Sequence, residues 1–241
     1  MLELTNVNVF YGAFHAIKDV TLFVDKGETV ALFGPNGHGK TTILGAISGS
    51  TMPRSGSIRY KGREIAKIEP SKRVEMGIVH VPQGGHLFPG LTVMENLKLG
   101  AYLSRAWRNR EQNLKKVFAL FPQLELRARQ KCSTLSGGER QMVATGRALM
   151  SSADFLILDE PTMGLSPKLA QELMGRIVEI KQAGMTMLLV EENLRLLTEL
   201  ADRMYLVENG RIVLGGPKSE VLRDEQVGRV YFGQHITEPG N

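Results

Sequence analysis

The octapeptide GPNGHGKT, residues 34–41, has the pattern G-x-x-x-x-G-K-[ST] in full. Thr29–Phe33 stand directly before it, and they are short, mostly apolar and β-branched residues of the kind that fill a strand buried on both faces of a parallel sheet. A helical pattern follows. Glycines between such a strand and helix let backbone N–H groups surround phosphate groups, and the helix N-terminus adds a favourable dipole. The segment therefore predicts a phosphate-binding loop in an α/β sheet.

The side chains of this loop have separate chemical tasks. Lys40 is long enough to reach the β- and γ-phosphates of a nucleotide, which also assigns it to catalysis, and Thr41 carries a hydroxyl suited to Mg²⁺. A glycine-rich loop without a nucleotide is the alternative, and the flanking strand and helix argue against it. The predicted nucleotide-binding residues of this segment are Gly34, Pro35, Asn36, Gly37, His38, Gly39, Lys40, Thr41 and Thr42.

Two carboxylates end another buried strand, whose apolar residues are 155–158. In a phosphate-loop protein a carboxylate at this place lies beside the magnesium ion, so Asp159 is the predicted metal ligand. Glu160, one residue further along, is placed to orient and polarise the water that attacks the γ-phosphate, and it is the candidate general base. An acidic pair that only faces solvent is the alternative, and the phosphate loop makes it the weaker one.

Buried-strand patterns recur at residues 77–81, 155–158 and 186–190, with helical patterns between them. Residues 2–9 alternate as a half-buried strand does, and a second strand is predicted at residues 16–24. This succession favours α/β architecture.

Residues 90–150 have mainly helical patterns, which open with a capping box formed by Thr92 and Glu95. We interpret them as a helical subdomain inserted into the sheet domain. Residues 204–207 and 211–214 flank Asn209-Gly210 and predict a hairpin. A short helix and a tail follow it.

The composition excludes several classes of protein. With 241 residues, 42% hydrophobic and 23% charged, the chain is sufficient for one folded domain. It contains no run of about 18 to 20 apolar residues and no signal-peptide pattern, so we expect it to remain in the cytosol. Cys132 is the single cysteine and is expected to be buried. The net charge is +5, and the charged residues are spread along the chain. The basic residues within 105–110 are expected to form a solvated helix face rather than a nucleic-acid surface.

The heptapeptide LSGGERQ, residues 135–141, lies shortly before the strand that ends in Asp159. Its serine and glutamate form a capping box, which alone would explain an ordinary helix start but leaves two glycines unexplained. With the two motifs above, it identifies the sequence as similar to the ATPases of ABC transporters over residues 2–225. The resemblance implies that Ser136, Gly137 and Gly138 bind the phosphate of an ATP held by the opposite subunit.

This resemblance implies a P-loop NTPase (RecA-like) core with an antiparallel β subdomain and an inserted helical subdomain. A single ABC ATP-binding domain would cover residues 2–237, with its core at about 2–89 and 150–225 and its helical subdomain at about 90–149. Residues 226–241 would form a short C-terminal tail.

Two further residues take roles from the same family. Tyr11 matches the aromatic residue that stacks on adenine, and Gln83 matches the Q-loop glutamine, which senses Mg²⁺ and the attacking water. Gln83 is therefore both a catalytic and a metal-ligand candidate. Residues 87–91 fall where such subunits receive a helix of the membrane partner, and core packing of Leu87 and Phe88 is the alternative.

The sequence departs from the family at two positions. Glu192 stands where most members have a histidine that contacts the γ-phosphate, and Ser166 stands where an aspartate is usual. These departures leave the activity of the chain's own site open, although Ser166 followed by Pro167 forms a good helix start. The pattern most resembles the second ATPase subunit of importers of branched-chain amino acids or related amides.

The implied partners are transmembrane permease subunits, a second ATPase, and indirectly a solute-binding protein, but no nucleic acid. A heterodimer of ATPases is favoured over a homodimer, and the expected place is the cytoplasmic face of the inner membrane. An exporter of lipid or lipopolysaccharide remains an alternative, since residues 227–233 fit both. A nucleotide-binding regulator with weak hydrolysis is another, because of Glu192. A soluble ABC protein of DNA repair or translation is disfavoured, because no tandem ATPase or coiled-coil insertion is present.

Overall fold

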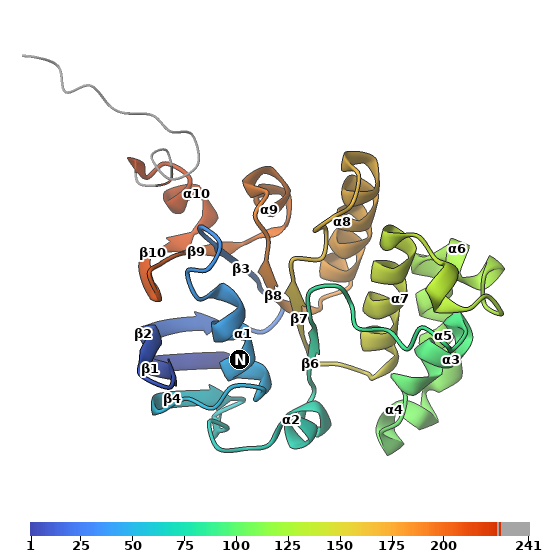
Figure 1. Ribbon diagram of the computed structural model, residues 1–241, viewed down its shortest axis with the longest axis horizontal. Helices are drawn as coiled ribbons and strands as arrows, with labels where there is room; N and C mark the ends of the chain where they lie inside the picture. The colour runs from blue at the N-terminus through green and yellow to red at the C-terminus, as the bar shows by residue number, and fades with distance from the viewer. Residues whose placement is uncertain (226, 228–241) are drawn as a thin grey trace, which may run out of the picture.

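Two β-sheets lie side by side, with helices packed around the larger one (Figure 1). The structure is a computed structural model, and it describes residues 1–225 and Val227. Apart from Val227, the predicted tail at residues 226–241 lies outside the described residues, as does most of the 227–233 segment. Among the described residues, no helix is long and apolar enough to cross a membrane.

The larger sheet holds the predicted buried strands and has the order β10-β9-β3-β8-β7-β6. Neighbouring strands run parallel from β9 to β6, whereas β10 pairs with β9 in the antiparallel direction. Every residue of β3, β7 and β8 is buried, which explains their apolar composition. The strands are β3 (Thr29–Phe33), β6 (Ile78–Val81), β7 (Phe155–Asp159), β8 (Thr186–Val190), β9 (Arg203–Glu208) and β10 (Arg211–Pro217).

The smaller sheet is antiparallel and has the order β2-β1-β4-β5, as the family resemblance implied. Its two long strands, β1 (Leu2–Tyr11) and β2 (Phe14–Val24), extend the two predicted ones by two residues each. The strands β4 (Ser55–Tyr60) and β5 (Arg63–Glu64) lacked a clear sequence pattern, because most of their residues are exposed and polar.

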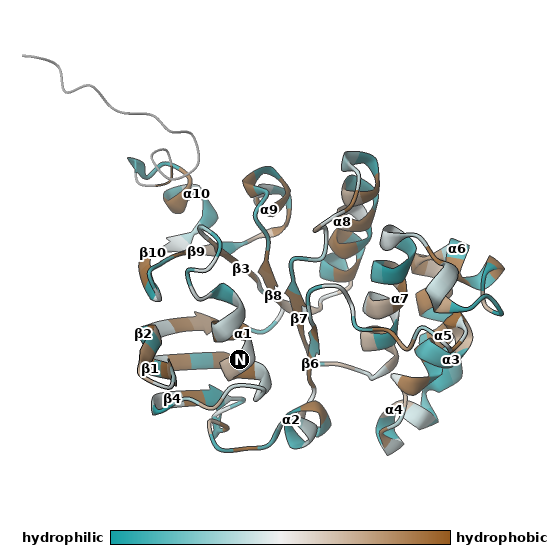
Figure 2. Cartoon of the chain, in the orientation of Figure 1, coloured by the Kyte–Doolittle hydropathy of each residue, from teal (hydrophilic) through white to brown (hydrophobic). Residues whose placement is uncertain are grey.

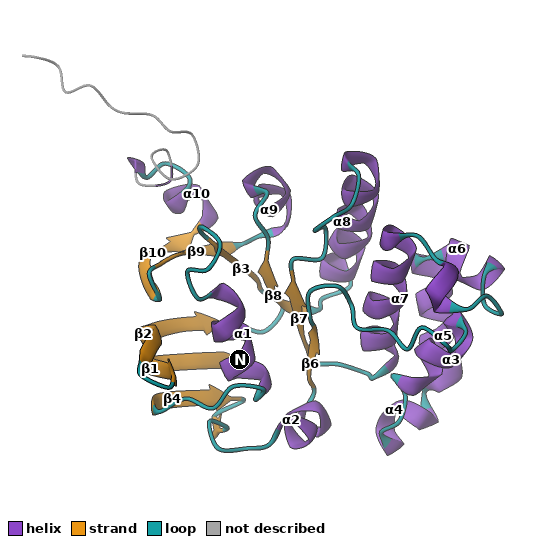
Figure 3. Ribbon diagram, viewed as in Figure 1, coloured by secondary structure: helices purple, strands orange, loops and turns teal. Residues whose placement is uncertain are grey.

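Five helices, α3 to α7, lie between β6 and β7 in the chain and form a group at one end of the molecule (Figure 3). The predicted capping boxes are present at the starts of α3 and α7. The helices are α1 (Lys40–Ser48), α2 (Pro70–Met76), α3 (Val93–Leu99), α4 (Ser104–Arg108), α5 (Arg110–Leu120), α6 (Pro122–Leu126), α7 (Gly137–Met150), α8 (Pro167–Gln182), α9 (Leu194–Leu200) and α10 (Lys218–Val221), with a 3₁₀ turn at Cys132–Thr134.

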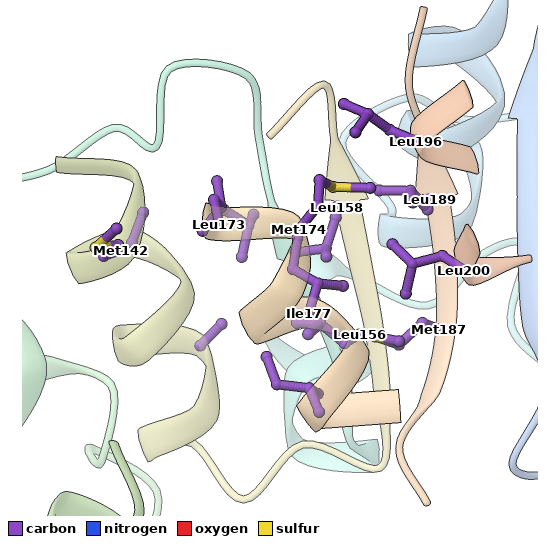
Figure 4. Close-up of a cluster of buried hydrophobic side chains, with 14 of the residues drawn as sticks. Met142, Leu156, Leu158, Leu173, Met174, Ile177, Met187, Leu189, Leu196 and Leu200 are labelled. Carbon is purple, nitrogen blue, oxygen red and sulfur yellow. The ribbon is translucent and has the colours of Figure 1, made fainter. Parts of the chain in front are cut away.

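The central strands supply both hydrophobic cores, since alternate residues of a strand point to opposite faces. On one face of the sheet, Leu156 and Leu158 of β7 join Met187 and Leu189 of β8 against helices, and Figure 2 shows the apolar character of these strands. On the other face, the alternate residues of the same strands pack against α1 and the smaller sheet. Figure 4 shows the first core with Met142, Leu156, Leu158, Leu173, Met174, Ile177, Met187, Leu189, Leu196 and Leu200 labelled.

Candidate functional site

The predicted phosphate loop connects the end of β3 to the first residue of α1. Gly34 must be glycine, because its φ is 139° and a Cβ there would lie 2.1 Å from the backbone oxygen of Val207. His38 anchors the loop from outside: its backbone oxygen accepts from the Gly210 N–H at 3.0 Å, and its Nδ1 accepts from the Asn209 N–H at 3.2 Å. The turn between β9 and β10 therefore fixes the loop in place.

The Lys40 ammonium occupies the middle of the loop. Its Nζ donates to the backbone oxygens of Gly34 at 2.8 Å and Pro35 at 3.0 Å, and lies 3.5 Å from Asn36 Oδ1. Burial lowers the pKa of Lys40, although Glu160 and the other nearby carboxylates oppose this shift. A cation held only by neutral oxygens can transfer its bonds to phosphate oxygens when a nucleotide enters.

Other predicted loop residues have conformations typical of a tight turn into a helix. Gly37 and Gly39 have positive φ values of 77° and 103°, which favour glycine. Thr41 and Thr42 lie in the first turn of α1, where backbone N–H groups have no partner within the helix.

Thr41 and Asp159 come together from distant parts of the sequence. Thr41 Oγ1 donates to Asp159 Oδ1 at 3.4 Å, and Asp159 is only 2% exposed. Burial raises the pKa of Asp159, whereas the Thr41 hydroxyl and Lys40 lower it. A buried carboxylate beside a hydroxyl is the hard oxygen set that suits Mg²⁺, which would complete its shell with phosphate and water. The residues present therefore fit the predicted metal.

Glu160 and Gln83 are also in contact, although 77 positions separate them. Gln83 Nε2 donates to Glu160 Oε2 at 2.8 Å. Glu160 has a φ of 46°, and its N–H donates to the Val190 oxygen at 2.9 Å, which fixes the backbone at the ends of β7 and β8. Burial and then Glu192 raise the pKa of Glu160, while Lys40 lowers it. A carboxylate with a raised pKa is a stronger base for a nearby water.

A cleft of about 730 Å³ joins several of these groups. Tyr11, Thr41, Gln83 and Asp159 all line it. The Tyr11 ring is 53% exposed, so its face is free for a base, and its hydroxyl lies 3.4 Å from Thr51 Oγ1. One open cleft thus joins the predicted adenine-stacking residue to the predicted metal ligands.

The signature residues Ser136, Gly137 and Gly138 do not line this cleft. They start α7, which Figure 1 shows beyond β7 and β6 from α1. Glu139 Oε2 accepts the Ser136 N–H at 2.8 Å, and this box orients the first turn of the helix. The signature residues of this chain therefore lie apart from the phosphate loop.

The sequence allowed two interpretations of the segment after Gln83: contact with the membrane partner, or core packing of Leu87 and Phe88. Leu87 packs against the hydrophobic core, whereas Phe88 is 54% exposed. Arg147 of α7 was missed by the sequence reasoning, yet its Nη2 donates to the backbone oxygens of Gly85 at 2.8 Å and His86 at 3.1 Å. No sequence pattern marks such a contact, because an arginine on a helix is usually only a solvated charge.

The structure also places Glu192 and Ser166, the two residues that depart from the family pattern. Glu192 is exposed beside the site and contributes to the raised pKa of Glu160. Ser166 caps α8, and its hydroxyl accepts the Leu169 N–H at 3.5 Å. Glu191, between Val190 and Glu192, is 4% exposed and was not predicted to matter.

A phosphate loop, a strand-end carboxylate pair and a separate signature helix define an ATP-binding cassette. In agreement, the family model described as ABC transporter matches residues 17–163, and the chain belongs to the ABC transporter family as an ATPase subunit whose activity is coupled to transport. Such subunits dimerise and work with transmembrane permeases.

Curated relatives match almost the whole chain. The high-affinity branched-chain amino acid transport ATP-binding protein BraG of Pseudomonas aeruginosa is 42% identical, with 97% of this chain and 100% of the relative covered. The probable branched-chain amino acid transport ATP-binding protein LivF of Archaeoglobus fulgidus is 37% identical, with 97% of this chain and 99% of the relative covered. The lipopolysaccharide export protein LptB of Haemophilus influenzae is 33% identical over 98% of each chain.

Solved structures support the fold. A nucleotide-free ATP-binding cassette from an ABC transporter has a TM-score of 0.83 and 27% identity, with 97% of this chain and 99% of that chain covered. A second cassette, in its ADP conformation, has the same TM-score and coverage with 29% identity. The predicted P-loop NTPase fold with an antiparallel sheet and inserted helices is confirmed.

Proposed function

We propose that this ATPase powers the uptake of a branched-chain amino acid or a related small polar solute. The observation that carries the proposal is the similarity to BraG and LivF, which extends over 97% of the chain at 42% and 37% identity. The glutamate at position 192 and the serine at position 166 agree with it, since this pair resembles the second ATPase subunit of such importers.

ATP would bind with its adenine on Tyr11 and its phosphates in the loop before α1. Lys40 would give up its bonds to the Gly34 and Pro35 oxygens and pair with the β- and γ-phosphates. Thr41 and Asp159 would hold Mg²⁺, which supplies charge neutralisation for the phosphates when bound. These residues orient the γ-phosphate toward the carboxyl end of β7.

Hydrolysis would then depend on Glu160 and Gln83. Glu160 is placed to accept a proton from the attacking water, and the raised pKa of its carboxyl suits that task. Gln83 contacts Glu160 directly, so it can help to orient the same water. Ser136, Gly137 and Gly138 of a second ATPase would close over the γ-phosphate with the N-terminal dipole of its α7.

The surface that would receive the permease is the loop after Gln83. Phe88 is exposed there, and Arg147 holds the loop to the signature helix through the Gly85 and His86 oxygens. Movement of α7 during closure would therefore displace this loop. The permease contact would place the chain at the cytoplasmic face of the inner membrane, as a peripheral subunit that meets the solute-binding protein only through the permease.

The partner ATPase is proposed to be a different chain. Glu192 brings a negative charge beside the γ-phosphate position, where a cationic or neutral donor would be favourable, so a second site with a better donor would complement it. Light scattering of Glu160→Gln protein tests this proposal. Because the substitution should slow hydrolysis, the ATP-bound dimer of ATPase subunits should persist long enough to be detected. We expect a monomer with MgATP alone and a dimer after the partner is added, whereas an MgATP-dependent homodimer would contradict the heterodimer.

Uptake in a deletion strain tests the transported solute. Complementation with the wild-type chain should restore uptake of radiolabelled leucine, and the Lys40→Met variant should not. Normal leucine uptake without this chain, together with lipopolysaccharide retained in the inner membrane, would instead favour the exporter, which the 33% identity to LptB supports. ATP turnover that requires Glu160 would exclude a regulator without hydrolysis.

A further inference from the structure

Glu191 is a buried carboxylate that joins two loops of the site. It is 4% exposed and lies directly after β8. Its Oε2 accepts from the Thr162 hydroxyl at 2.6 Å, and Thr162 is itself only 8% exposed. Its Oε1 accepts the backbone N–H of Glu192 at 3.0 Å and of Asn193 at 3.4 Å. Each of these hydrogen bonds stabilises the Glu191 carboxylate, whose charge would be costly to bury without partners.

The inference rests on the proposed function, in which these two loops hold the groups around the γ-phosphate. One follows β7 and carries Glu160 and Thr162, and the other follows β8 and carries Glu192. β7 and β8 are parallel neighbours, with Asp159 opposite Val190, so both loops leave the same edge of the sheet. A bond from the Glu160 N–H to the Val190 oxygen at 2.9 Å also joins the ends of these two strands.

The Glu160 backbone has an unusual conformation. It adopts the left-handed region with a φ of 46°, which is unfavourable for a residue with a side chain. A turn follows it, with the Met163 N–H bonded to the Glu160 oxygen at 3.1 Å. Thr162 lies within this turn, so its bond to Glu191 restrains the turn from the side of β8.

We propose that Glu191 and Thr162 are positioning residues for hydrolysis. Their hydrogen bond fixes the turn that carries Glu160 to the loop that carries Glu192, so that both face the γ-phosphate in a constant arrangement. Glu191 and Thr162 bond to each other and to the backbone of the loop after β8, not to the phosphate loop. The pair therefore acts on the rate of hydrolysis through Glu160 and leaves the binding of ATP to the loop before α1 unaffected.

The test compares three threonine variants of the full-length chain. Thr162→Val removes the hydroxyl at nearly constant volume, and Thr162→Ser restores it. Thr186→Val is the matched control. Thr186 is also buried, with 2% exposure, and it begins β8. Its hydroxyl accepts the Gly27 N–H at 2.9 Å, at the end of the strand opposite to Glu191. ATP affinity and thermal unfolding are measured for each variant alone, and kcat and KM in complex with a hydrolysis-deficient partner ATPase.

We expect Thr162→Val to lower kcat by about tenfold or more, because small displacements of catalytic groups have large effects on rate. Its KM and ATP affinity should stay within about twofold of wild type, and Thr162→Ser should recover most of kcat. Thr186→Val should lose a comparable amount of stability with kcat unchanged. The conservative rescue distinguishes positioning from a general loss of stability.

Two results would overturn the proposal. One is a kcat of Thr162→Val equal to that of Thr186→Val, and the other is a raised KM with kcat unchanged. Should Thr162→Val not fold, Glu191→Met gives the same comparison, with a lowered kcat expected at unchanged ATP affinity. A wild-type chain without turnover in complex with the partner ATPase would refute its ATPase activity, which is a different failure from that of the Glu191–Thr162 pair.

Discussion

Replacement of Lys40 by methionine should greatly weaken ATP binding while the fold is retained. The Lys40 ammonium is 4% exposed and bonds to the backbone oxygens of Gly34 and Pro35. Bonds to a charged donor each contribute about 1.5–3 kcal/mol, but burying an ammonium costs several kcal/mol. These contributions oppose each other, and the methionine fills a similar volume. We expect the free energy of unfolding to stay within about 2 kcal/mol of wild type.

The effect on the nucleotide is larger. At about 4 Å and an effective dielectric constant of about 20, the attraction between the ammonium and one phosphate charge is about 4 kcal/mol. Since about 1.4 kcal/mol corresponds to a tenfold change in affinity, Lys40→Met should weaken ATP binding by about a thousandfold. Thermal unfolding without nucleotide serves as the control for the fold.

Isothermal titration calorimetry with MgATP measures this difference directly. Lys40→Arg is a useful companion, because it keeps the charge but not the compact shape of the ammonium in the loop. A Lys40→Met protein that unfolds like wild type and binds MgATP within about threefold of wild type would refute the assigned role, since the Coulomb attraction predicts about a thousandfold loss.

Substitutions at four other positions have separate expected outcomes. Tyr11→Ala should weaken ATP binding about tenfold by fluorescence titration, with Tyr11→Phe unchanged, because the ring face rather than the hydroxyl supports a base. Thr41→Val should raise the Mg²⁺ concentration needed for half-maximal turnover, and an unchanged requirement would contradict its pairing with Asp159. Gly100→Ala should destabilise the fold by about 1–3 kcal/mol in urea unfolding, since its Cβ would lie 2.0 Å from the Arg147 backbone oxygen. Gly175→Ala, within α8 and with no atom near its Cβ, should stabilise it by up to about 1 kcal/mol.

Much of the fold follows from local sequence patterns. Thr29–Phe33 and Thr186–Val190 were predicted with their final bounds, because a strand buried on both faces contains mainly apolar residues between polar turns. The strands β4 and β5 could not be predicted, because their stability comes from pairing with β1 and with each other rather than from their own composition.

The site was predictable where a motif fixes the chemistry. The sequence placed Thr41 and Asp159 in one metal site, and the structure brings them within 3.4 Å. Glu191 and Arg147 escaped prediction, because their partners are a hydroxyl and backbone oxygens that lie 29 and about 60 positions away. A glutamate beside another glutamate has the appearance of a solvated pair until its burial is known.

Release of inorganic phosphate from a single turnover of MgATP tests the ATPase mechanism most directly. It is measured for wild-type and Glu160→Gln protein, each in complex with a hydrolysis-deficient partner ATPase. The account predicts equal ATP binding by both proteins, with phosphate release slowed by at least about a hundredfold in Glu160→Gln, because the proton acceptor for the attacking water is lost. Equal rates of phosphate release at equal ATP occupancy would contradict it.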